Sequence, residues 1–88
     1  MAEWIGGRGG ARLDAETADR LRVAWLSLPV DAAPGHPAWD AVSEILDEIH
    51  RDPPRDSGQR QALARAMYAA MLGVPERLER ELRTAGIV

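Results

Sequence analysis

The stretch HPAWDAVSEILDEIHR, residues 36–51, decides the fold because its apolar side chains recur at helical spacing. They stand three or four residues apart, which places them on one face of a helix, with charged residues on the other face. A helix with such a stripe must bury it against other parts of the chain. The stripe consists of Trp39, Val42, Ile45, Leu46 and Ile49.

Three further segments show helical periodicity, and none shows the alternation of a β-strand. Asp14 is the expected N-cap of the first helix, and Pro29 ends that helix. Asp56 with Gln59 resembles a capping box at the start of the third helix, and Gly73 suits the left-handed position after its end. The sequence therefore predicts an all-α, compact four-helix bundle with helices over about residues 15–28, 37–51, 57–72 and 75–85.

The first and third helices should cover most of the apolar stripe in residues 36–51. We expect Val23 to widen the apolar face of the first helix and Met71 to face inward from the third. The last helix has few apolar residues in its interior, so it should contribute little to the core. Ile45 and one edge of the Trp39 ring are then expected to lack a partner within the chain.

The domain organisation is simple, with a Gly-rich N-terminal arm over residues 1–12 and a single helical domain over residues 13–88. The run GGRGG loses much conformational entropy on ordering, which favours a flexible arm. Trp4 and Ile5 favour the alternatives, in which the arm folds back into a groove of the bundle or contacts a partner.

The composition limits the functional classes that need to be considered. The formal charge of −3 argues against non-specific binding to nucleic acid, which needs a positive field. There is no cysteine for a disulfide or a thiolate metal site, and no apolar run long enough to cross a membrane. All 11 basic residues are arginine, which together with abundant alanine and glycine indicates a GC-rich bacterial or phage source. A cytoplasmic location is the default expectation.

The sequence carries no clear catalytic or metal-binding pattern. His36 and Asp40 stand four residues apart at the start of the second helix. Asp47, Glu48 and His50 cluster near its end, but a metal ion needs three or four ligands that converge on one point. No nucleophile triad, phosphate-binding loop or HExxH motif occurs. We therefore predict a protein that is not an enzyme and that uses no metal or cofactor.

The C-terminal third offers an interpretation as a DNA-binding element. AAMLGV at residues 69–74 is followed by RLERELR at residues 77–83 and then by Gly86-Ile87, a pattern that resembles a helix-turn-helix of the Fis type. The segment is about one residue shorter than that pattern, and glutamates accompany its arginines. An ordinary Gly-capped helical hairpin accounts for the same residues. The resemblance implies a transcriptional regulator with a degenerate helix-turn-helix over residues 60–86 and DNA contacts at Arg77, Arg80 and Arg83.

Protein recognition is the leading functional prediction. The helix over residues 36–51 combines an aromatic side chain with an acidic outer row, and tryptophan is among the residues that most often anchor interfaces. We expect a small adaptor, inhibitor or regulatory protein whose partner is another protein, a second copy of this chain included. The interface candidates are Trp4, Trp39, Asp40, Glu44, Ile45, Asp47 and Glu48.

Overall fold

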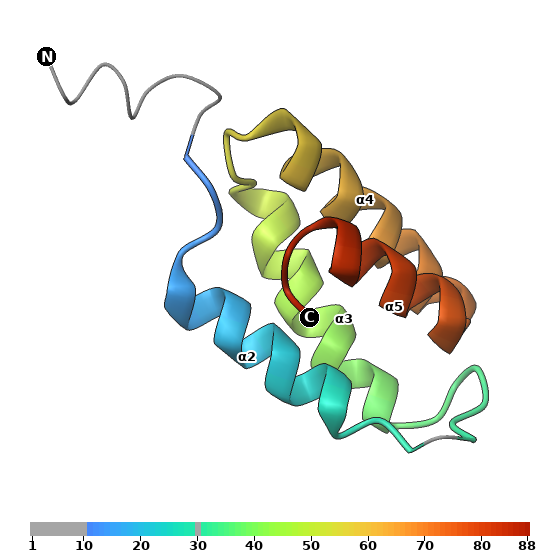
Figure 1. Ribbon diagram of the computed structural model, residues 1–88. Helices are drawn as coiled ribbons and strands as arrows, with labels where there is room; N and C mark the ends of the chain where they lie inside the picture. Colours follow the sequence, from blue (N-terminus) through green and yellow to red (C-terminus); the bar gives the residue numbers. More distant parts are fainter. Residues whose placement is uncertain (1–10, 30) are drawn as a thin grey trace, which may run out of the picture.

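The computed structural model describes residues 11–29 and 31–88, and this part of the chain is all-helical. Residues 1–10, including Trp4, lie outside the described residues, so the proposed arm stays a prediction there. None of the helices in the described part is long and apolar enough to cross a membrane. The four helices in Figure 1 are α2 (Ala15–Leu26), α3 (Ala38–Arg51), α4 (Ser57–Leu72) and α5 (Pro75–Thr84).

The helix boundaries follow the sequence except at the end of α2. This helix ends at Leu26, two residues earlier than expected, because Pro29 disfavours helical backbone at the preceding Leu28. Its start is as expected, since an Asp14 carboxylate oxygen accepts a hydrogen bond from the Thr17 backbone N–H at 3.0 Å. The smaller differences at the start of α3 and the end of α5 amount to one residue each.

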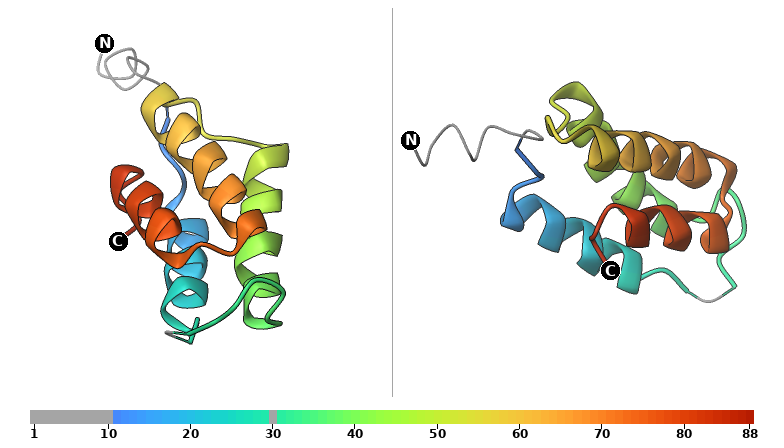
Figure 2. Two further views of the ribbon diagram at one scale, coloured as in Figure 1. Left: turned by 90° about the vertical axis from the view of Figure 1, so that its right-hand side faces the viewer. Right: turned by 45° about the horizontal axis from the view of Figure 1, so that its top comes forward.

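The apolar stripe of α3 is buried over its whole length, with α2 on one side and α4 on the other (Figures 1 and 2). The expectation that Ile45 and an edge of Trp39 would lack internal partners was wrong, because their exposed fractions are only 8% and 4%. The loop before α3 also closes over Trp39. The indole Nε1 donates a hydrogen bond to the Ala33 carbonyl at 3.1 Å, and Ala32 of the same loop is part of the core.

The last helix contributes more to the core than its sequence suggested. Leu78 and Leu82 are fully buried, and α5 packs along α4 in the opposite direction (Figure 2). Two side-chain contacts mark this alignment. Arg65 on α4 donates to the Glu81 carboxylate at 2.9 Å. One turn after Glu81, the Ala85 carbonyl accepts a hydrogen bond from the Gln59 side chain at the start of α4. The pair therefore forms an antiparallel helical hairpin around the turn at Gly73.

Gln59 ties both ends of the described chain to α4. Its side-chain Oε1 accepts a hydrogen bond from the Leu13 backbone N–H at 2.6 Å, and its Nε2 donates to the Ala85 carbonyl at 2.9 Å. The predicted capping box is therefore only half present. Asp56 accepts the Gln59 backbone N–H, but the backbone N–H of Asp56 donates to the Ala11 carbonyl instead of to Gln59. A buried glutamine thus fixes the paths by which the chain enters and leaves the helical domain.

Candidate functional site

The exposed apolar side chains give the first indication of a functional surface, because clustered exposed apolar residues often mark contacts with other molecules. Five of the six in the described part lie in the second halves of α2 and α4, which run in the same direction and so end at the same end of the molecule (Figure 1). The six residues are Val23, Leu26, Tyr68, Met71, Leu72 and Val88.

Two of these residues are exposed, although the sequence predicted that they face the core. Val23 is 60% exposed and Met71 is 70% exposed, whereas both were expected to point into the core. Among the described helices, the close backbone contacts of α2 are with α3, and the face that α2 buries is narrow and centres on Leu21 and Ala24. On α4, Met71 follows the buried Ala70, and one residue turns the side-chain direction by about 100°.

An open groove of about 490 Å³ lies between α2 and α3. Val23 and Ala41 supply apolar surface, and Glu16 and Asp19 supply carboxylates on the α2 side. Leu26 is 71% exposed and stands one turn beyond Val23 on the same helix. The exposed side of α2 therefore combines aliphatic and acidic groups with the guanidinium of Arg20, which also lines the groove.

The outer face of α3 adds a row of carboxylates. Asp40, Glu44 and Asp47 are exposed and stand four and three residues apart, which aligns them along one side of the helix. Asp47 is paired with Arg51 at 3.6 Å. Among the described residues, neither Asp40 nor Glu44 has a cationic group within 4 Å. The described part of the chain therefore neutralises this row only in part.

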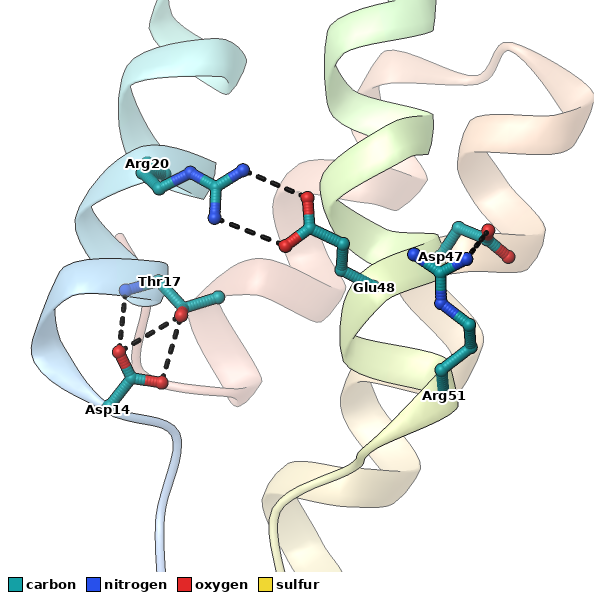
Figure 3. Close-up of polar contacts among 6 residues, drawn as sticks. All are labelled: Asp14, Thr17, Arg20, Asp47, Glu48 and Arg51. Carbon is teal, nitrogen blue, oxygen red and sulfur yellow. Dashed lines mark hydrogen bonds and ion pairs between the residues drawn. The ribbon is translucent and has the colours of Figure 1, made fainter.

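A bidentate ion pair, with two hydrogen bonds, links α2 and α3 across this surface (Figure 3). The Arg20 guanidinium donates to the two carboxylate oxygens of Glu48 at 3.2 and 3.0 Å. These hydrogen bonds, with the charge of Arg20, lower the pKa of Glu48. The pKa of Asp14 is likewise lowered, first by the Thr17 backbone N–H and then by the Thr17 hydroxyl. The Arg20 and Glu48 side chains are exposed, so solvent screening keeps the contribution of their ion pair to stability small.

The Arg20–Glu48 pair should make stability depend on pH in the acid range. Because the pKa of Glu48 is lower in the folded chain, its contribution is complete above the usual glutamate range and is lost as the pH falls through the folded value. We expect the melting temperature to fall from about pH 5 downward, and Glu48→Gln to make that fall shallower. Arg20→Gln is the matched variant, and thermal melts at about pH 3 to 7 measure both. An unchanged slope in Arg20→Gln would contradict this assignment.

The structure divides the predicted interface residues into two groups. Asp40, Glu44, Asp47 and Glu48 lie on the outer face of α3, while Trp39 and Ile45 lie in the core. The prediction that Trp39 and Ile45 contact a partner is therefore corrected, because α2, α4 and the loop before α3 cover the face that they occupy. Trp4 lies outside the described residues, so its role stays a prediction.

Sequence reasoning missed Val23 and Leu26 as surface residues. A signal for them was present, because Leu21, Ala24 and Leu28 follow the spacing of three and four that defines one face of a helix. Val23 and Leu26 fall outside that series. Large aliphatic residues off the stripe of a short amphipathic helix are candidates for an external contact.

The arginines of α5 lie on a helix that runs alongside α4. Arg77, Arg80 and Arg83 are all exposed, and Arg83 is paired with Glu79 at 2.6 Å. The two helices of a DNA-binding helix-turn-helix cross at about 90–120°. The antiparallel contacts from Gly73 to Ala85 are instead those of a helical hairpin. Within residues 11–29 and 31–88, no three potential metal ligands gather at one point.

Comparison with known proteins gives no relative from which a function could be transferred: no family model, curated protein or solved structure matches the chain.

Proposed function

We propose that this protein is a small non-catalytic adaptor, inhibitor or regulatory protein that binds another protein through the exposed sides of α2 and α3. The observation that carries the proposal is the pair of exposed aliphatic residues, Val23 and Leu26, on a helix that also places the Glu16 and Asp19 carboxylates in the groove beside Val23. We call this the α2–α3 surface. It consists of Glu16, Asp19, Val23, Leu26, Asp40, Glu44 and Asp47.

The chemistry of this surface favours a basic, amphipathic partner segment. Val23 and Leu26 can bury aliphatic or aromatic side chains, which supply most of the affinity in protein interfaces. Among the described residues, Glu16, Asp40 and Glu44 have no cationic group within 4 Å, so arginine or lysine of a partner can pair with them. Such charges mainly speed association and select the partner.

Substitution of Leu26 tests the proposal. Leu26→Asp should reduce capture of the partner by about 30-fold, the factor that corresponds to loss of an interface anchor. Met71→Asp is the matched control, because Met71 is 70% exposed against 71% for Leu26 but lies on α4. The measurement uses immobilised full-length chain with extract of the source organism. The same captured protein is quantified for each variant, and thermal melts verify folding.

Equal capture by the Leu26→Asp and Met71→Asp chains would contradict the α2–α3 surface. A labelled DNA duplex provides the second comparison, because the DNA-binding interpretation assigns contacts to Arg77, Arg80 and Arg83. We expect no duplex binding at physiological salt. Binding that weakens steeply as salt rises, and that is lost when these arginines are changed to glutamate, would overturn the proposal.

A further inference from the structure

A second groove, of about 440 Å³, lies between the end of α2 and the start of α5. Its walls are mainly apolar, and one of them carries two carboxylates. We call it the α2–α5 groove. It is lined by Trp25, Leu26, Leu28, Pro29, Pro75, Glu76 and Glu79.

The two carboxylates of this groove differ in whether a cationic side chain of the described residues pairs with them. Glu79 pairs with Arg83 at 2.6 Å. Among the described residues, Glu76 has no cationic group within 4 Å, although the amino end of α5 favours a negative charge at this position. Trp25 is half-buried and places an aromatic side chain in the same groove. Negative charge and an aromatic side chain thus share an apolar recess.

This combination fits an arginine side chain. The guanidinium can stack on an aromatic ring and donate two hydrogen bonds to a carboxylate, while its aliphatic stem packs on apolar walls. A neutral apolar side chain would leave Glu76 uncompensated beside it. A carboxylate ligand would be repelled by both glutamates of the groove.

We infer that the α2–α5 groove binds an arginine of the partner together with the apolar residue next to it. This inference rests on the proposed function, because Leu26 belongs to both the groove and the α2–α3 surface. A partner segment that covers Leu26 can therefore continue into the groove. The groove then selects among basic amphipathic segments by the position of one arginine.

Two dipeptide probes test the inference without the partner. N-acetyl-leucyl-arginine amide and N-acetyl-leucyl-glutamine amide are titrated into the ¹⁵N-labelled full chain, and shifts of the Trp25 indole N–H and of the Leu28 and Glu76 amides are followed. We expect the arginine probe to bind with a dissociation constant of about 1–10 mM. The glutamine probe should bind about three- to fivefold more weakly.

Variants of the groove separate its charge from its shape. Glu76→Gln combined with Glu79→Gln should weaken the arginine probe to the level of the glutamine probe and leave the glutamine probe unchanged. Glu44→Gln, on the α2–α3 surface, is the matched control and should change neither. Equal binding of the two probes, or no binding near these residues, would overturn the inference. Shifts at these residues that grow with protein concentration alone would instead assign the groove to a second copy and also overturn it.

The two proposals can fail separately. The probe titration requires no partner, so it can succeed even if Leu26→Asp leaves partner capture unchanged. Conversely, loss of capture in Leu26→Asp with no response to the arginine probe would support the α2–α3 surface and remove the groove from the interface.

Discussion

Trp39→Ala should lower the free energy of unfolding by about 3–5 kcal/mol. The side chain is only 4% exposed in a core of leucine, isoleucine, valine and alanine, and its Nε1 donates to the Ala33 carbonyl. An 88-residue chain has a total stability of about 4–13 kcal/mol, so this variant should lose a large part of it. The melting temperature should fall by more than about 12 °C.

Chemical denaturation with two companion variants identifies the cause. Trp39→Phe keeps an aromatic ring but removes the hydrogen bond to Ala33, so we expect a loss of about 1–2 kcal/mol. Tyr68→Ala removes an aromatic ring that is 64% exposed, and its effect should stay within about 0.5 kcal/mol. If Trp39→Ala unfolded at the wild-type denaturant concentration and lost a partner instead, Trp39 would be an interface residue.

Gly73→Ala should cost about 2–5 kcal/mol, from two sources. Gly73 has a φ of 68°, which an L-residue adopts at a cost of about 1–2 kcal/mol. A Cβ at this position would also lie 2.7 Å from the Cα and 2.9 Å from the Cβ of Pro34. Relief of that clash must move the loop before α3 or the turn between α4 and α5, at a further cost of about 1–3 kcal/mol.

Substitutions at two other glycines allow the cost of the positive φ and the cost of the clash with Pro34 to be measured separately. Gly35 has a φ of 89°, and a Cβ there would meet no other part of the chain within 4 Å, so Gly35→Ala should cost only the backbone share, about 1–2 kcal/mol. Gly58 has ordinary backbone and a nearest neighbour at 3.7 Å, so Gly58→Ala should raise stability by about 0.4–1 kcal/mol. Denaturant melts of the three variants should rank them in this order. A Gly73→Ala chain as stable as the Gly35→Ala chain would contradict the contact with Pro34.

The helices and their ends were predictable because local chemistry determines them. The stripe in residues 36–51 has the period of a helix, and all five of its apolar residues are buried as that period requires. Asp14 and Asp56 cap their helices through backbone N–H groups three residues later, and Gly73 has the left-handed backbone expected of it. These features depend on few neighbours in the sequence, so they can be read without the tertiary structure.

Long-range contacts were not predictable in the same way. Nothing near Trp39 in the sequence shows that the preceding loop covers its ring. Gln59 resembled half of a capping box, yet its side chain reaches Leu13 and Ala85 at the two ends of the described chain. Such contacts depend on how the helices pack, and the same local pattern is compatible with several arrangements.

The candidate site shows the same division. The acidic row of α3 could be expected from spacing alone, because its residues fall on the polar side of the helix. Which apolar residues stay exposed depends on how much of each helix its neighbours cover. Among the described helices, α2 has its close backbone contacts with α3, and this leaves Val23 and Leu26 outside while Trp39 and Ile45 are enclosed.

The most direct measurement of the central claim is site-specific photo-crosslinking in cells of the source organism. A photoreactive amino acid is placed at position 26 or, as the matched control, at position 71, since the native side chains are 71% and 70% exposed. We expect one protein adduct from position 26 and none from position 71. We also expect the yield of this adduct to fall when Glu16, Asp40 and Glu44 are all changed to glutamine, because association becomes slower. No adduct from position 26, or the same adduct from both positions, would contradict a partner-binding surface on α2 and α3.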